Sequence, residues 1–319
     1  MSAPYPYVPH PQARPHVPVT SWRRYPVVLP IRGRRPPLWV PVVILVLFLA
    51  PGIYAWWRYG PAGDEPLVTL RHIGWIEVGV AVAVVAITVV FGWARSVGWV
   101  PRPRSALAVP LIAVALVATS VLLIGTAGFA LSWAFSAYVI LLVNFLAVGV
   151  FEETLFRGLL WASLPVRWSA SRVLLVTSVC FGGVHVTNGF TTGNWGVAVA
   201  QACVVSFSGL GLGALRLRTG WLGLGVITHA FIDAGLAATT ALLPELRGAD
   251  PEHLAPALAV ASLLFLALLG LYASLAVSGV VVLVRTFRAE RQQRRWVALA
   301  GRVPGVDPWW TPPPPTLVE

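Results

Sequence analysis

Long apolar runs separated by short polar connections make up most of the chain. A membrane-spanning helix needs about 20 mostly apolar residues to cross about 30 Å of hydrocarbon. Eight stretches meet or approach this length, and aromatic residues such as Trp56, Trp93 and Trp161 near their ends match the interfacial belt of spanning helices. The stretches are approximately 38–57, 73–93, 106–126, 132–160, 171–188, 196–216, 221–243 and 256–284. This pattern predicts an all-α, polytopic membrane protein with about eight transmembrane helices.

The distribution of basic residues predicts the orientation of these helices. Short cytoplasmic connections are enriched in Lys and Arg, and all 23 basic residues of this chain are Arg. If the N-terminus is cytoplasmic, all of them except Arg58, Arg71 and Arg247 lie on the cytoplasmic side. The connections 127–131 and 189–195 on the other side carry no charge. We therefore expect an even number of spans, with the N-terminus and the C-terminus both cytoplasmic.

The two ends of the chain differ in composition from its middle. Residues 1–37 contain repeated prolines, which favour extended backbone and cannot build a packed core, so we expect a disordered tail there. Residues 38–285 form the predicted membrane helical domain, whose first apolar run would serve as an uncleaved anchor. Residues 286–319 are rich in Arg and Pro, and we expect a flexible C-terminal tail after a short surface helix.

Composition narrows the class of protein. The chain is 57% hydrophobic and 11% charged, whereas soluble domains carry about a quarter charged residues. A net charge of +11 could suit nucleic acid or an anionic lipid surface, but the placement of the arginines around the spans favours membrane lipid and no nucleic acid. Cys180 and Cys203 lie in apolar runs and form no disulfide framework or CxxC motif. The Arg-, Ala- and Val-rich composition suggests a bacterial source and a multi-pass location in the cell membrane.

The first group of ionisable residues inside a span lies in segment 151–157. An ionisable side chain near the bilayer centre costs about 2.5–3.5 kcal/mol on insertion scales, so its presence suggests a function. Glu153 and Arg157 are one helical turn apart and suit an ion pair. Glu152 points about 100° away, which leaves it available as a general base. The alternative is a purely structural charge cluster at the cytoplasmic end of the fourth span. Glu77 is expected to be interfacial.

Two further segments place histidines in the spans. Phe181 lies one turn before His185, and the two glycines between them would allow a neighbouring backbone to approach. A lone histidine on an apolar face is more often a packing residue. His229 and Asp233 are spaced i and i+4, which suits a hydrogen-bonded dyad, a pair of metal ligands or a packing contact. At 1.5 Å per residue, Glu152 and His229 come about 12–17 Å from the cytoplasmic ends and His185 about 20 Å, so all three could line one pocket.

These three segments resemble the CAAX-protease and bacteriocin-processing family of intramembrane endopeptidases. The pattern is Glu-Glu-x-x-x-Arg, then Phe-x-x-x-His, then His-x-x-x-Asn or Asp, within about 150–235. The eight-span topology is also similar to that of the type II CAAX prenyl endopeptidases of this family. The resemblance implies hydrolysis of a peptide bond in a membrane-associated peptide or protein substrate, including lipidated substrates.

The resemblance also implies a role for each candidate residue. Glu152 would activate the attacking water, His185 would assist or hold that water, and Glu153 with Arg157 would form a supporting pair. His229 and Asp233 would complete the site. An ionised Asp cannot donate a hydrogen bond to an oxyanion, so this side chain would more naturally orient His229 or bind a metal.

Neither a cofactor nor a single function follows from the motifs alone. Two histidines with nearby carboxylates could form a catalytic zinc site, but the family is also described as metal-independent glutamate proteases, and the chain lacks a His-Glu-x-x-His motif. A non-catalytic membrane scaffold or bacteriocin-immunity protein of the same fold is one alternative. A proton-coupled transporter is another, although the spans show no clear inverted repeat. We interpret the glycine-rich run 209–213 as a close helix crossing.

Overall fold

The computed structural model describes residues 34–60, 72–101, 108–166, 168–245 and 251–300, which form helices joined by short loops. The predicted all-α class is therefore confirmed. The tails predicted at the two ends lie largely outside the described residues. The helices are α1 (Trp39–Tyr59), α3 (Trp75–Val90), α4 (Ala94–Val97), α5 (Ala108–Ala130), α6 (Phe135–Glu153), the π-helix η2 (Thr154–Leu160), α7 (Trp161–Ser163), α8 (Ala170–Val184), the 3₁₀-helix η3 (His185–Thr187), α9 (Asn188–Thr192), α10 (Trp195–Thr219), α11 (Leu222–Glu245) and α12 (Pro251–Ala300).

The helix lengths agree with a chain that crosses a membrane several times. Within the described residues, seven helical segments are long and apolar enough to span. They correspond to every predicted span except the second. At that position α3 is apolar but has 16 residues, which gives about 24 Å at 1.5 Å per residue. The structure is thus consistent with a polytopic membrane protein in which one of the eight expected spans is short.

The last helix is much longer than its predicted span of 256–284. α12 has 50 residues, or about 75 Å, more than twice the thickness of the hydrocarbon. Its extension beyond Arg285 is attached to the bundle by Glu290, which is 3% exposed. The carboxylate of Glu290 accepts hydrogen bonds from the backbone N–H of Ser171, at 3.0 Å, and from its hydroxyl. An anion is stabilised here because Ser171 lies in the first turn of α8.

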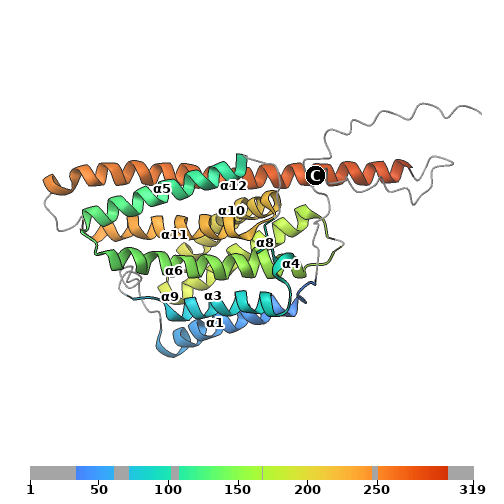
Figure 1. The fold of residues 1–319 in the computed structure, drawn as a ribbon, viewed down its shortest axis with the longest axis horizontal. Helices are drawn as coiled ribbons and strands as arrows, with labels where there is room; N and C mark the ends of the chain where they lie inside the picture. The colour runs from blue at the N-terminus through green and yellow to red at the C-terminus, as the bar shows by residue number, and fades with distance from the viewer. Residues whose placement is uncertain (1–33, 61–71, 102–107, 167, 246–250, 301–319) are drawn as a thin grey trace, which may run out of the picture.

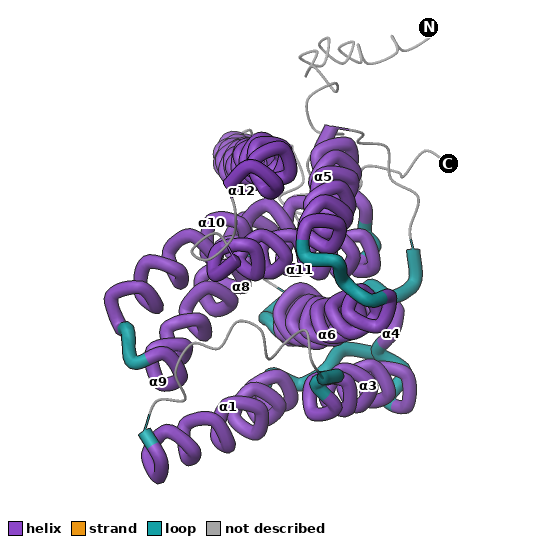
Figure 2. The backbone as a smooth tube through the Cα atoms, turned by 90° about the vertical axis from the view of Figure 1, so that its left-hand side faces the viewer, coloured by secondary structure: helices purple, strands orange, loops and turns teal. Residues whose placement is uncertain are grey.

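The helices form a bundle in which α6 is central. Figure 1 shows α12 and α5 along one side of the molecule, and α1 and α3 along the opposite side. α6 lies between α3 and α11, and α11 lies between α6 and α5 (Figure 2). α10 packs against both α8 and α12. Residues from the two ends of the described chain therefore enclose α6 and its neighbours.

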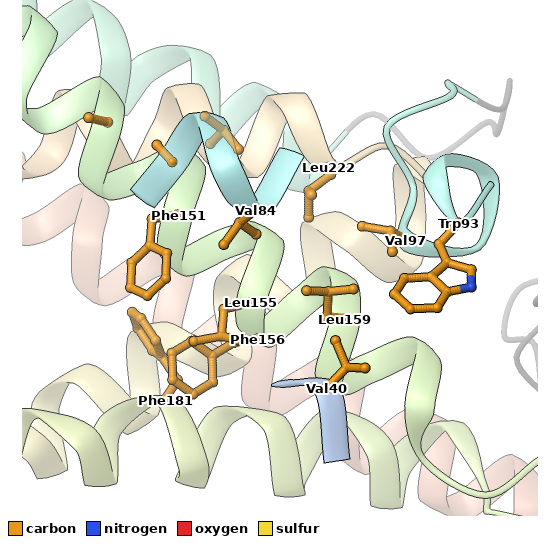
Figure 3. Packing of buried hydrophobic residues seen from close by; sticks show 13 residues of the cluster. Val40, Val84, Trp93, Val97, Phe151, Leu155, Phe156, Leu159, Phe181 and Leu222 are labelled. Carbon is orange, nitrogen blue, oxygen red and sulfur yellow. The ribbon is translucent and has the colours of Figure 1, made fainter. Parts of the chain in front are cut away.

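Buried aromatic and aliphatic side chains surround the end of α6 and the π-helix η2. Phe151, Leu155 and Phe156 pack there with Phe181 of α8, as Figure 3 shows. The rings of Phe156 and Phe181 have centroids 5.3 Å apart in an edge-to-face arrangement, a geometry that aromatic pairs favour. Val40 of α1 belongs to the same cluster. The polar residues of segment 151–157 are thus placed inside an apolar environment.

Arginines at one end of the bundle bind backbone carbonyl groups. Arg216 donates to the carbonyl oxygens of Val97 at 2.9 Å, Ser96 at 3.3 Å and Arg157 at 3.4 Å. Arg35 donates to the carbonyl of Ala162 at 2.7 Å. Carbonyl groups at helix ends have no partner within the helix, so cations near them are stabilising. Some of the arginines that set the predicted orientation therefore also fix the ends of α4, η2 and α7.

Glycines allow three of the helices to approach closely. A Cβ atom added to Gly182 of α8 would lie 1.9 Å from Ser206 Oγ and 2.4 Å from the carbonyl oxygen of Ala202 in α10. A Cβ atom on Gly211 of α10 would lie 2.6 Å from the carbonyl oxygen of Leu275 in α12. Such contacts are possible only without a side chain, as in membrane helix crossings formed by small residues. The interpretation of run 209–213 as a close crossing is confirmed.

We expect Gly182→Ala to lower the free energy of unfolding by about 1–3 kcal/mol, because its methyl group would overlap α10. The matched control is Gly183→Ala, since a Cβ atom there meets nothing within 4 Å. The control should leave stability unchanged or raise it by up to about 1 kcal/mol. Thermal unfolding of both variants in detergent measures the difference, and equal midpoints would contradict the α8–α10 contact.

Candidate active site

The three sequence motifs meet where α6, α8 and α11 pack around η2. Glu152 and Glu153 end α6, Arg157 lies in η2, His185 begins η3, and the remaining two candidates lie in α11. The π-helix follows directly after the paired glutamates, and π-helical turns often occur at functional sites. Segments up to about 80 residues apart in the chain are therefore brought into one cluster.

A fully buried ion pair forms the base of this cluster. Arg157 Nη1 donates to Glu153 Oε1 at 2.8 Å, and the two side chains are 0% and 1% exposed. Arg157 Nη2 donates to the carbonyl of Gly209 at 3.2 Å. The guanidinium carbon lies 3.8 Å from the centroid of the Phe181 ring, which adds a cation–π contact. The pair expected from the i,i+4 spacing is present, and it includes two partners that spacing alone did not indicate.

His229 contacts three carboxylates. Its Nδ1 lies 3.1 Å from Glu153 Oε1, and its Nε2 lies 3.2 Å from Asp233 Oδ2 and 3.5 Å from Glu152 Oε2. Ionised carboxylates only accept hydrogen bonds, so this arrangement suits a ring that carries a proton on each nitrogen. The contact with Glu152 is long for a hydrogen bond, which leaves the oxygens of Glu152 able to accept from another group.

The end of α8 orients His185. The backbone N–H of His185 bonds to the carbonyl of Gly182 rather than to that of Phe181, because the helix tightens to a 3₁₀ turn. The carbonyl of Phe181 instead lies 3.0 Å from His185 Nδ1. A carbonyl can only accept, so Nδ1 donates, and Nε2 of the neutral ring keeps its lone pair. His185 also interacts electrostatically with Glu152.

Exposure divides the cluster into a buried support and an accessible edge. The side chains of Glu153 and Arg157 are almost fully buried, whereas those of Glu152 and Asp233 are 19% and 31% exposed. His185 is half-buried. Water and substrate therefore have access to the residues at the edge, while the ion pair holds them from below. Such a set of groups can position and deprotonate a water molecule.

The donor atoms do not form a zinc site in this arrangement. Across the described residues, no group of three or more His, Cys, Asp or Glu side chains is placed to hold a metal ion. Both nitrogens of His229 face carboxylate oxygens, and Nδ1 of His185 is used by the carbonyl of Phe181. The zinc ligand set considered from the sequence is therefore not assembled here, and the chemistry of the site is derived from its protein groups.

Sequence reasoning missed Tyr272 of α12. Its hydroxyl is hydrogen-bonded to Ser208, and it interacts electrostatically with Asp233 and Arg157. The signal in the sequence is weak: Tyr272 is a single phenol in a span of aliphatic and small residues. Only the packing of α12 on α10 brings it to the site.

Fold and site together define a polytopic membrane protein with a buried carboxylate–histidine cluster. Residues 132–235 match the family described as Type II CAAX prenyl endopeptidase Rce1-like. The chain thus carries an Rce1-like type II CAAX prenyl endopeptidase domain over these residues, which confirms the resemblance drawn from the motifs. All six candidate residues lie within it. Comparisons with curated proteins and with solved structures gave no match.

We expect Arg157→Met to lower the free energy of unfolding by about 3–5 kcal/mol, because it leaves the carboxylate of Glu153 buried without its cation. Arg172→Met is the matched control, since Arg172 is exposed and makes only a cation–π contact with Trp168. That change should cost about 1 kcal/mol or less. The measurement is thermal unfolding of the purified variants, and equal losses would show that the buried pair is not a special support.

Proposed function

We propose that the protein is an intramembrane endopeptidase that hydrolyses a peptide bond with a water molecule activated by Glu152. The observation that carries the proposal is the accessible carboxylate of Glu152 beside His185 and His229, within an Rce1-like domain. The buried Glu153–Arg157 pair supports it, because a reactive carboxylate needs a rigid surround to stay in position.

In the first step, a water molecule binds between Glu152 and Nε2 of His185. A carboxylate oxygen of Glu152 takes one proton, and the water oxygen attacks the carbonyl carbon of the scissile bond. The electron pair of the carbonyl moves to its oxygen and gives a tetrahedral oxyanion. In the second step the C–N bond breaks, the carbonyl re-forms, and Glu152 passes its proton to the departing amine. Proton transfer of this kind contributes about 10²–10⁴-fold to the rate.

His229 holds the charge that develops in this reaction. With a proton on each nitrogen, the ring is cationic and lies next to the attacking carboxylate. Glu153 fixes Nδ1 and Asp233 fixes Nε2, so the ring cannot turn. A preorganised positive charge near an oxyanion stabilises the transition state more in an apolar site than in water. Asp233 therefore acts as an orienting acceptor rather than as a donor.

The membrane setting suggests the class of substrate. With both ends of the chain in the cytoplasm, as the arginine distribution predicts, the Glu-Glu end of α6 lies toward the cytoplasmic side of the bilayer. A substrate anchored to that surface by lipid would present its peptide bond at this depth. The family description names CAAX prenyl endopeptidases, and CAAX denotes a C-terminal motif whose cysteine is prenylated. Lipidated proteins, or membrane peptides such as bacteriocin precursors, fit this class.

Glu152→Gln removes the base with almost no change of shape, so we expect it to abolish cleavage. The membrane-protein termini of cells expressing the wild type should include new ends that are absent with Glu152→Gln. Glu77→Gln, the same change in the first turn of α3, serves as the control and should match the wild type. Mass spectrometry of protein termini makes the comparison. Identical sets for all three would refute the peptidase, and a phenotype that survives Glu152→Gln would favour the scaffold or immunity alternative.

His185→Asn should lower kcat by about 10²–10⁴-fold on a substrate identified in this way. The amide can still donate to the carbonyl of Phe181, but the basic nitrogen at the Nε2 position is lost. His72→Asn, the same substitution at an exposed position before α3, should leave kcat unchanged. Steady-state cleavage in reconstituted vesicles measures both variants. Wild-type kcat for His185→Asn would remove this histidine from the mechanism.

A further inference from the structure

α12 holds Tyr272 at a fixed distance from α10. A Cβ atom on Gly279 would lie 2.4 Å from the carbonyl carbon of Leu210, and one on Gly211 would lie 2.6 Å from the carbonyl oxygen of Leu275. Tyr272, Leu275 and Gly279 are spaced i, i+3 and i+7, so they share one face of α12. The close crossing therefore directs Tyr272 toward α10 and limits how far it can move.

The hydroxyl of Tyr272 reaches the support of the candidate active site. It is hydrogen-bonded to Ser208, which is 3% exposed. The next residue, Gly209, accepts the hydrogen bond from Arg157 Nη2. Tyr272 also interacts electrostatically with Asp233. A phenol from outside the matched domain, residues 132–235, thus lies near both the buried ion pair and the accessible edge.

The site needs a hydrogen-bond donor at this edge. Nη1 and Nη2 of Arg157 bond to Glu153 and Gly209, and both nitrogens of His229 face carboxylates. The motif that this chain resembles allows Asn at position 233, and an amide would supply an N–H. Asp233, when ionised, supplies none. A tetrahedral oxyanion is stabilised by preorganised donors, each worth about 10²–10³-fold in kcat.

We propose that Tyr272 is a catalytic residue whose O–H donates a hydrogen bond to the oxyanion beside Asp233. The inference rests on the proposed peptidase function and extends the site to α12. Tyr272 keeps its proton throughout, so no bond to hydrogen is broken in this role. Ser208 holds the phenol in place, and the His229–Asp233 pair next to it is close to neutral overall because the cationic ring is paired with one carboxylate.

Tyr272→Phe is the first test, measured as kcat and KM in vesicles on a substrate identified by the comparison of protein termini. We expect kcat to fall about 10²-fold with KM unchanged, because the lost bond exists only in the transition state. Tyr138→Phe, the same change in α6, should keep the wild-type kcat. Wild-type kcat for Tyr272→Phe, or a rise in KM alone, would overturn the inference.

The second test combines Tyr272→Phe with Asp233→Asn. The amide introduced at position 233 can donate to the oxyanion, so in that background Tyr272→Phe should lower kcat by less than about threefold. A merely structural Tyr272 would cause the same loss in both backgrounds, together with a lower unfolding midpoint. Failure of the peptidase function is recognised separately, because wild type and Glu152→Gln would then give identical protein termini.

Discussion

The ion pair between Glu153 and Arg157 is the interaction on which the rest of the structure depends. Neither charge is stable alone in an apolar bundle, and breaking such a pair costs about 3–5 kcal/mol. The guanidinium ties α6 to the backbone of α10 and to the ring of Phe181 in α8, and the carboxylate binds His229 of α11. One buried pair thus fixes the relative positions of four helices.

Close helix contacts make these polar bonds possible. Gly209 is both an acceptor for Arg157 and a position where a Cβ atom would lie 3.0 Å from Arg157 Nη2. Gly182 lets α8 approach α10, which brings Phe181 over the guanidinium. In a lipid environment, where packing rather than hydrophobicity drives helix association, small residues are the usual means of such an approach. The glycines and the charged residues therefore work as one unit.

Much of the fold follows from the sequence because membrane spans are read from length and apolarity. All eight predicted stretches are helical, although α3 is shorter than a full span and α12 extends far beyond Arg285. The contact between Glu153 and Arg157 follows from helical spacing. The π-helix after Glu153, the 3₁₀ turn at His185 and the approach of Tyr272 do not. They depend on contacts between helices distant in the chain, which no local pattern records.

The 3₁₀ turn at His185 has a consequence for how its imidazole is controlled. The tautomer is set by a main-chain carbonyl released at a helix terminus, whereas many functional histidines rely on a neighbouring acid. A main-chain acceptor carries no net charge, so it selects the protonated nitrogen without adding another anion to a site that already holds three. Side-chain substitutions elsewhere leave this acceptor in place. Only a change in where the helix ends would remove it.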